Sequence, residues 1–371
     1  MEVRPLPEHL VRYAESEIAR LQVPGAAIGV LHDGVIYAAG VGITNVEHPL
    51  PVTPETLFQI GSTSKTFTAT ALMSLVEAGR VDLDATVRTY LPWFALQSEV
   101  DAAKLTVRNL VTHHAGYVGD YFKDTGRGDD AIATIVRKMA NSPQLVPAGY
   151  TFSYSNAAFY VTGHIVETVH GRPFEHVIRD TIFEPLGMSD TSFFVAPEKT
   201  HRLAANYERQ RDKTLRLIDD PPTSTYLREP AFFSGGAGLT STTADYLRFC
   251  EMLRRGGELD GARVLGRRTI ELMTKNHLPG GASLAGLAIG AFSETAYDGV
   301  GFGLGFAMTL SDVATGTPGL GEYYWGGAAS TIFWIDPKED LVVIFMTQLM
   351  PSATFNFRGQ LKTIIYGAMT D

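Results

Sequence analysis

The chain has 371 residues, of which 45% are hydrophobic and 19% charged, with 37 glycines and 19 prolines. This composition is typical of a soluble globular protein with a large core divided between two lobes. The formal net charge of −9 at pH 7 offers no basic face, so nucleic acid is not an expected partner. The single cysteine, Cys250, excludes an internal disulfide and any CxxC metal or redox motif.

The first ten residues lack the basic start and apolar segment that mark a secretory signal. No run of 18 or more apolar residues occurs, so the sequence predicts no membrane-spanning segment. We therefore expect a cytoplasmic protein by default, although a periplasmic protein with its leader removed would give the same sequence.

The N-terminal part of the chain predicts a helix followed by a hairpin. Apolar residues recur at helical spacing over residues 8–22. Two apolar runs then follow, residues 26–31 and 35–39, and Asp33-Gly34 lies in the connection between them. An Asp-Gly pair between apolar runs favours a tight antiparallel hairpin.

The C-terminal part repeats this pattern in reverse order. Residues 331–335 and 341–346 are apolar runs that flank the polar segment 336–340, and residues 355–368 have helical periodicity. Strands from both ends of the chain should therefore share one antiparallel sheet, with the two terminal helices packed on it. The predicted fold class is α+β.

The middle of the chain, residues 81–234, is rich in loops and favours helices, which is typical of an inserted lobe. We expect residues 1–80 and 235–371 to form the lobe with the antiparallel sheet, and residues 81–234 to form a mainly helical lobe. An active site would then lie in the cleft between the two lobes.

The stretch around Ser62 and Lys65 carries the strongest chemical signal. Lys65 is the only charged residue between Ser62 and Val76, so this segment predicts a buried central helix on which Lys65 lies one turn after Ser62. A lysine amine in such surroundings suits a general base, and a helix N-terminus offers free amides where an oxyanion would form. A Ser-x-x-Lys pattern also occurs by chance on surface helices, but the apolar neighbourhood argues against that alternative.

A second motif, Tyr154-Ser-Asn156, precedes another helical run. It resembles the Tyr-x-Asn motif of class C β-lactamases, DD-peptidases and family VIII carboxylesterases. The resemblance implies that the Tyr154 phenol relays a proton between the serine, the leaving group and the deacylating water. It also implies that the Asn156 side chain helps to hold the lysine and the substrate.

A third motif is Trp325-Gly326-Gly327-Ala328. It is similar to the edge strand that begins Lys-Thr-Gly in β-lactamases and Trp-Gly-Gly in many family VIII esterases. The resemblance implies that Gly326 and Gly327 let substrate lie along this strand. It further implies that the amides of Ser62 and Ala328 form the oxyanion hole.

The three motifs occur in the order that this superfamily uses. Four further segments resemble it: residues 23–30, 105–116, 185–191 and 236–241. The chain is therefore identified as a member of the serine β-lactamase and penicillin-binding-protein-like superfamily. Within it, the chain resembles family VIII carboxylesterases most. The resemblance implies a β-lactamase/transpeptidase-like fold. The α/β-hydrolase alternative fails, because the chain has no Gly-x-Ser-x-Gly motif and its hairpins predict an antiparallel sheet.

This resemblance implies a covalent acyl-enzyme on Ser62, with Lys65 and Tyr154 jointly moving its proton, and no cofactor or metal. Trp325 stands where β-lactamases place a lysine or histidine that meets the substrate carboxylate. The indole offers an apolar wall instead, so short-chain carboxylic esters are the first expected substrates. A β-lactam (most of all a cephalosporin) comes second and a D-amino-acid amide or peptide third. Acyl transfer to an alcohol stays open because it shares the acyl-enzyme, whereas the retained reactive residues disfavour a non-hydrolytic sensor or scaffold.

Other conspicuous residues favour structural roles. His113-His114 could suggest a metal site, but no HExxH motif or carboxylate cluster accompanies them, so a place at the end of a helix is favoured. The glycines of residues 301–306 have the wrong spacing for a dinucleotide fingerprint and predict a strand. Tyr117 and Tyr121 are further candidates to line the cleft.

Overall fold

The computed structural model describes residues 2–95, 103–116, 148–289 and 295–369. Its centre is an eight-stranded sheet in which all neighbours are antiparallel except the first two, which are parallel. Across this sheet the strands are β1 (Glu2–Pro5), β3 (Val35–Gly42), β2 (Gly25–His32), β16 (Leu341–Thr347), β15 (Ile332–Asp336), β14 (Tyr323–Gly326), β13 (Ala307–Thr309) and β12 (Val300–Phe302).

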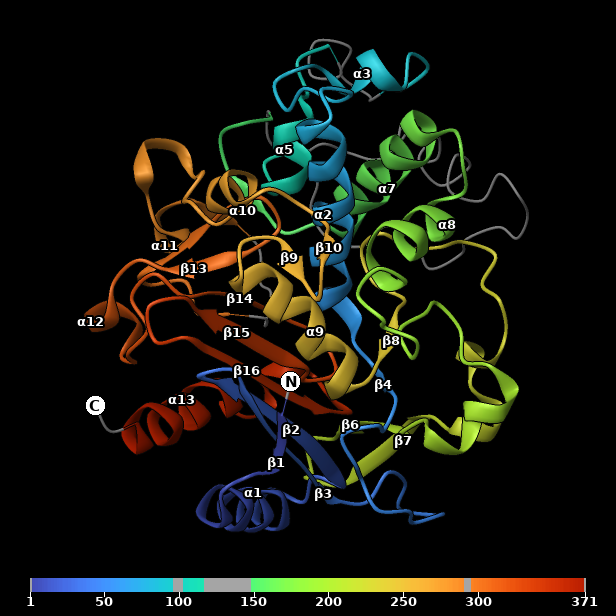
Figure 1. Cartoon of the computed structure of the whole chain (residues 1–371), viewed down its shortest axis with the longest axis vertical. Helices are drawn as coiled ribbons and strands as arrows, with labels where there is room; N and C mark the ends of the chain where they lie inside the picture. The colour runs from blue at the N-terminus through green and yellow to red at the C-terminus, as the bar shows by residue number, and fades with distance from the viewer. Residues whose placement is uncertain (1, 96–102, 117–147, 290–294, 370–371) are drawn as a thin grey trace.

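Both predicted hairpins are confirmed. β2 and β3 are joined by Asp33 and Gly34, whose φ angles of 50° and 75° are those of a tight hairpin turn. β15 and β16 form the second hairpin, and β16 also pairs with β2. Strands from the two ends of the chain therefore lie side by side in one sheet, as predicted (Figure 1).

Helices cover both faces of the sheet. On one face, Phe333 of β15 packs on Tyr246 of α9 (Thr243–Arg254), with ring centroids 5.2 Å apart. On the other face, Phe345 of β16 packs on Phe357 of α13 (Phe357–Ala368), with centroids 4.8 Å apart. The period-2 alternation of strand side chains supplies both contacts, since Phe333 lies opposite Ile344, one position from Phe345.

The two terminal helices lie together on the face that α13 covers. α1 (Glu8–Leu21) packs against β3, and its Glu17 is hydrogen-bonded by Gln360 of α13. The helical expectations for residues 8–22 and 355–368 are therefore confirmed, with α1 burying Leu10, Ala14, Ile18 and Leu21.

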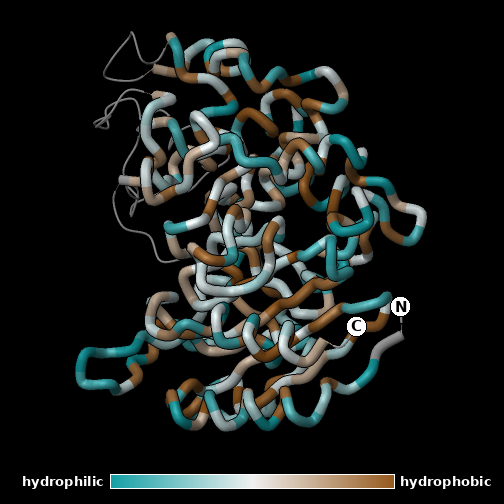
Figure 2. The backbone as a smooth tube through the Cα atoms, turned by 90° about the vertical axis from the view of Figure 1, so that its left-hand side faces the viewer, coloured by the Kyte–Doolittle hydropathy of each residue, from teal (hydrophilic) through white to brown (hydrophobic). Residues whose placement is uncertain are grey.

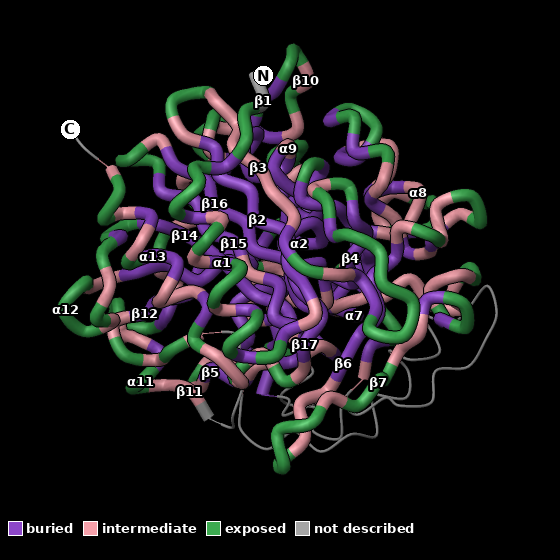
Figure 3. The backbone as a smooth tube through the Cα atoms, turned by 90° about the horizontal axis from the view of Figure 1, so that it is seen from below, coloured by how far each residue is buried: buried purple, intermediate pink, exposed green. Residues whose placement is uncertain are grey.

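The central helix α2 (Ser64–Glu77) is buried on nearly all sides, because its side chains are apolar or hydroxylic except for Lys65 and the terminal Glu77. Figure 3 shows it within the buried interior, and Figure 2 shows hydrophobic segments concentrated inside hydrophilic outer turns. Ser62 itself precedes this helix, in the single 3₁₀ turn Gly61–Thr63.

The segment 81–234 contributes both helices and strands. Among its described residues the α-helices are α3 (Val87–Tyr90), α5 (Val107–Val111), α7 (Asn156–His170) and α8 (Phe174–Ile178), of which α7 and α8 pack against α2. The hairpin of β6 (Asn206–Arg209) and β7 (Leu215–Asp219) also belongs to it and pairs with β17 (Leu349–Met350). The middle segment is thus tied to the C-terminal part of the chain by main-chain hydrogen bonds.

The described residues also form three two-stranded ladders and three further α-helices. The ladders are β4 (Phe58–Gln59) with β8 (Thr240–Ser241), β5 (Phe152–Ser153) with β11 (Ala288–Ile289), and β9 (Glu258–Leu259) with β10 (Ala262–Arg263); the helices are α10 (Arg267–Met273), α11 (Leu284–Leu287) and α12 (Asp312–Thr315).

Residues 301–306 do not form one strand as predicted. β12 ends at Phe302, and Gly303 to Phe306 make the turn to β13, where Gly305 has a φ of 89°. That prediction was wrong because closely spaced glycines favour a turn.

Across the described ranges, the structure contains no helix of the length and apolar character needed to cross a membrane.

Candidate active site

The turn that carries Ser62 lies against the end of β14. Gly61 has a φ of 52°, and a Cβ at this residue would lie 3.3 Å from the backbone nitrogen of Ala328. The Thr331 hydroxyl donates a hydrogen bond to the Ile60 carbonyl at 3.0 Å and fixes the two segments together. The structure therefore brings Ser62 beside the strand end that the sequence predicts for the oxyanion hole.

Gly327 has no room for a side chain. A Cβ there would lie 2.3 Å from both the carbonyl oxygen of Ile60 and the hydroxyl of Thr331, well inside van der Waals contact. The second glycine of the Trp-Gly-Gly motif is therefore needed for the close approach of β14 to the serine turn.

Lys65 is 1% exposed, and its amine contacts Ser62, Asn156 and Gly236. Nζ lies 3.2 Å from Ser62 Oγ, 2.5 Å from Asn156 Oδ1 and 2.6 Å from the Gly236 carbonyl oxygen. Two of these partners only accept hydrogen bonds, so they occupy two N–H groups and direct the third position of the nitrogen toward Ser62. An ammonium would donate there, and a neutral amine would present its lone pair to the serine proton.

Asn156 and Gly236 reach Lys65 through close contact of two backbones. Asn156 is the first residue of α7, whose N-terminus is capped by Ser155, which accepts a hydrogen bond from the Ala158 amide. A Cβ on Gly235 would lie 2.6 Å from the Phe159 carbonyl oxygen. The Gly235-Gly236 pair thus lets this loop press against α7 and aim its carbonyl at the lysine.

Tyr154 completes the group. It directly precedes the cap of α7, and Lys65 Nζ lies 4.8 Å from the centre of its ring. Its hydroxyl is buried. Ser62, Lys65, Tyr154 and Asn156 are therefore brought together from separate parts of the chain, as the motifs predict.

Trp325 is placed differently from the expected apolar wall, since its side chain is 0% exposed. Its ring packs on Tyr154 at 5.4 Å and on Phe302 at 5.2 Å between centroids. Because side chains alternate along β14, Tyr324 points the other way, toward a cavity. In this structure Trp325 supports the tyrosine, and it could contact substrate only if it were uncovered.

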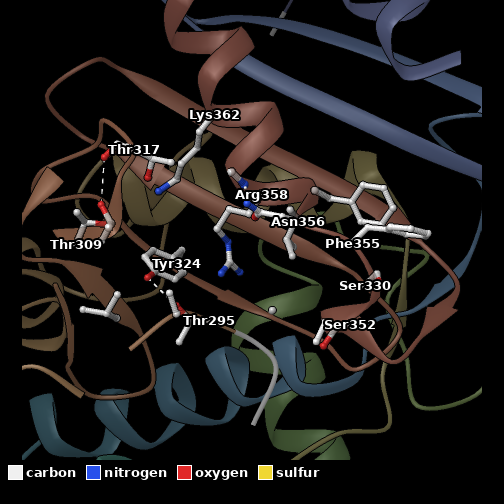
Figure 4. Close-up of a pocket in the computed structure, with 18 of the residues that line it drawn as sticks. Thr295, Thr309, Thr317, Tyr324, Ser330, Ser352, Phe355, Asn356, Arg358 and Lys362 are labelled. Carbon is white, nitrogen blue, oxygen red and sulfur yellow. Dashed lines mark hydrogen bonds between the residues drawn. The ribbon is translucent and has the colours of Figure 1, made fainter. Parts of the chain in front are cut away.

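A cavity of about 320 Å³ adjoins β14 and is lined by Tyr324, Gly326 and Gly327 together with Arg358 and Lys362 of α13. Arg358 extends into the cavity (Figure 4), and its guanidinium lies 4.5 Å from the centre of the Tyr324 ring. One of its nitrogens donates a hydrogen bond to the Trp325 carbonyl at 3.0 Å. The sequence does not predict this cation, because nothing in the residues around Arg358 indicates that α13 begins beside β14.

The described residues include no group of three or more His, Cys, Asp or Glu side chains that could hold a metal ion. Tyr117 and Tyr121 lie outside the described residues.

Comparisons with known proteins place this geometry in a family. The family model described as Beta-lactamase matches residues 10–364. Penicillin-binding protein 4 of Amycolatopsis lactamdurans is 31% identical over 327 residues, which cover 88% of this chain and 81% of that protein. Esterase EstB of Burkholderia gladioli is 27% identical over 360 residues, covering 88% of this chain and 86% of that protein.

A solved structure agrees with these matches. The structure described as EstCE1, a hydrolase with promiscuous acyltransferase activity, superimposes with a TM-score of 0.80 at 26% identity. The superposition covers 96% of this chain and 97% of that chain. The predicted β-lactamase/transpeptidase-like fold is thereby confirmed.

Proposed function

The chain belongs to the beta-lactamase family of serine hydrolases, and we propose that it hydrolyses short-chain carboxylic esters through a covalent acyl-enzyme on Ser62. The observation that carries this proposal is the contact of the Lys65 amine with Ser62 Oγ, while Asn156 and Gly236 hold that amine from the other side.

In the proposed reaction, Ser62 Oγ attacks the ester carbonyl as its proton moves to Lys65 or Tyr154. The backbone amides of Ser62 and Ala328 would stabilise the tetrahedral oxyanion. Proton return to the alkoxide releases the alcohol and leaves the acyl group on Ser62. A water molecule, deprotonated by the same pair, then attacks the acyl carbonyl and frees Ser62.

The choice of esters is supported by Trp325, which directly precedes Gly326 and Gly327. Trp325 supplies no cation there, and a desolvated carboxylate without a cation or several donors is costly. The relative named Esterase EstB agrees with esters as substrates. EstCE1 is described as a hydrolase with promiscuous acyltransferase activity, which agrees with acyl transfer to an alcohol as a further activity that the same acyl-enzyme would allow.

β-Lactam hydrolysis, above all of cephalosporins, is the second candidate, and Arg358 is the observation that favours it. Its guanidinium lies in the cavity beside Gly326 and Gly327, where it could meet a substrate carboxylate. The name of penicillin-binding protein 4 agrees with such a ligand. A D-amino-acid amidase or peptidase activity ranks third.

A substrate panel tests this proposal: p-nitrophenyl acetate, butyrate and octanoate, nitrocefin, and D-alanyl p-nitroanilide, each with wild type and Ser62→Ala. We expect the highest kcat/KM for the two short esters, and loss of nearly all activity in Ser62→Ala, as is usual when a nucleophile is removed. A higher kcat/KM for nitrocefin than for every ester would replace esterase with β-lactamase. Ester hydrolysis retained in Ser62→Ala would overturn the mechanism.

A further inference from the structure

His113 holds the backbone on both sides of Tyr154. Its carbonyl oxygen accepts a hydrogen bond from the Ser153 amide at 2.7 Å. Its imidazole Nδ1 accepts a hydrogen bond from the Ser155 amide at 3.2 Å. His113 follows α5 with a φ of 57°, a left-handed conformation that turns both acceptors toward the same three residues.

The imidazole ring also packs directly on the tyrosine. The ring centroids of His113 and Tyr154 lie 4.6 Å apart, and Phe152, Phe159 and Phe302 surround the rest of the imidazole at 5.1–5.4 Å. His113 is 0% exposed. These rings restrict the movement of the imidazole, which keeps its acceptor atom beside the Ser155 amide.

Protonation would abolish the Nδ1 hydrogen bond, since a protonated imidazole accepts none. Among the described residues, the titratable groups that face the ring are Lys65 from α2, Tyr154 from the loop before α7, and the neighbouring His114. Burial first, and then the positive charge of Lys65, hold the pKa of His113 well below its usual range. The imidazole is therefore neutral at ordinary pH, with its proton on Nε2 and Nδ1 free to accept.

We propose that His113 is a positioning residue, which fixes the Tyr154 phenol for proton transfer by accepting the Ser155 amide at Nδ1. The inference rests on the proposed function, because it acts through the tyrosine of the acyl-enzyme mechanism. Tyr154 sits in the short connection between β5 and α7, where the backbone could shift if this acceptor were lost. A displacement of about 1 Å in a catalytic group can cost on the order of 100-fold in rate.

Three variants of His113 separate the acceptor from the ring. In His113→Asn the side-chain oxygen can occupy the place of Nδ1, and asparagine tolerates the left-handed backbone. In His113→Gln the longer amide reaches the place of Nε2 instead, and His113→Leu has no acceptor. We expect kcat for p-nitrophenyl butyrate to fall about 10- to 100-fold in the Leu and Gln variants with little change in KM, and to recover within about fivefold of wild type in the Asn variant.

The neighbouring His114→Asn is the matched control. His114 is also buried, but its Nδ1 contacts the carbonyl oxygen of Thr112 at 2.8 Å and not the backbone around Tyr154. This variant should retain wild-type kcat. Thermal unfolding of all four variants would separate loss of rate from loss of the folded protein.

The rate at which a fluorophosphonate labels Ser62 gives a readout that needs no ester substrate. This labelling rate depends on deprotonation of Ser62. It should therefore be higher in His113→Asn than in His113→Gln and His113→Leu even if the natural substrate is not an ester. An absence of ester hydrolysis in wild type would therefore overturn the proposed function alone. Equal rates in the Asn and Leu variants, or wild-type rates in all variants, would overturn the positioning role.

Discussion

The indole of Trp325 lies against the phenol ring of Tyr154, with centroids 5.4 Å apart and ring planes inclined by 51°. Trp325 comes from β14, the strand that leads to Ala328, whereas Tyr154 precedes α7. The strand expected to bind substrate and the residue expected to move protons therefore share one aromatic contact. A change at Trp325 should affect both binding and proton transfer.

Replacing Trp325 with lysine tests this contact. The ammonium would enter a fully buried site between Tyr154 and Phe302, and desolvating a cation costs several kcal/mol. We expect Trp325→Lys to lower the Tm clearly and to lower kcat/KM for p-nitrophenyl butyrate by more than about tenfold. Trp325→Phe keeps an aromatic ring at the same place and should retain most of the thermal stability and most of the kcat/KM for this ester.

The same pair of variants tests the choice of substrate. If the lysine amine reaches the substrate carboxylate, the ratio of kcat/KM for nitrocefin to that for the butyrate ester should rise about 10- to 100-fold. A Trp325→Lys protein with unchanged Tm and an unchanged ratio would contradict both the burial and the charge argument.

Local patterns predicted the hairpins, the terminal helices and the one-turn spacing of Ser62 and Lys65, because these depend on neighbours within a few residues. The Gly236 carbonyl and Arg358 were not predicted as part of the site, since their positions depend on how distant segments pack. The glycine pair 235–236 was the available signal, because adjacent glycines often mark close backbone contact. The burial of Trp325 had no local signal, since either face of β14 would suit an indole.

The contact between Gly236 and Lys65 leads to a second prediction. In Gly235→Ala the new methyl group would lie 2.6 Å from the Phe159 carbonyl oxygen, so the loop must move away from α7. The Gly236 carbonyl would then lose its 2.6 Å contact with Lys65 Nζ. We expect kcat for the butyrate ester to fall about 10- to 100-fold.

Gly286→Ala is the control for this substitution, because a Cβ at Gly286 meets no atom within 4 Å. It should leave kcat unchanged. Wild-type kcat in Gly235→Ala would show that Lys65 does not depend on the Gly236 carbonyl.

Arg358 gives the third prediction. Its guanidinium contacts the Trp325 carbonyl and lines the cavity beside the glycine strand. Arg358→Gln keeps a hydrogen-bond donor but removes the charge. It should therefore weaken the binding of an anionic substrate more than that of a neutral one. We expect kcat/KM for nitrocefin to fall about tenfold and that for p-nitrophenyl butyrate to change less than threefold. Equal losses for both would mean that Arg358 acts on the strand and not on the substrate.

The fourth prediction concerns the buried pair of Glu322 and Lys362, which joins the residue directly before β14 to α13. Glu322 is 0% exposed, contacts the Lys362 amine, and accepts a hydrogen bond from the Thr309 hydroxyl at 2.7 Å. Removing one partner leaves a buried charge unpaired, so Lys362→Met should cost about 3–5 kcal/mol in the free energy of unfolding. The double variant Glu322→Gln with Lys362→Met should cost less than Lys362→Met alone. Urea unfolding of the three proteins measures this, and a double variant less stable than Lys362→Met would contradict it.

The last prediction concerns pH and Asp245, near the N-terminus of α9. Its carboxylate accepts hydrogen bonds from the Asp190 amide at 2.7 Å and the Thr191 hydroxyl at 2.9 Å, yet burial raises its pKa to about 6. The unfolded chain should show a pKa of about 3.9 for this group. Between these two values the folded state binds more protons than the unfolded state, so stability from this group is full below pH 4 and is lost as pH rises through 6. Asp245→Asn keeps an acceptor oxygen and removes the titration.

We therefore expect the stability of Asp245→Asn relative to wild type to increase by about 1–3 kcal/mol between pH 4 and pH 7.5. Urea unfolding at several pH values in this range measures the difference. The exposed Asp312→Asn serves as the control for loss of one carboxylate at the surface. If the Asp245→Asn difference were constant over this pH range, the buried carboxyl would not titrate in the range and the assigned pKa direction would be wrong.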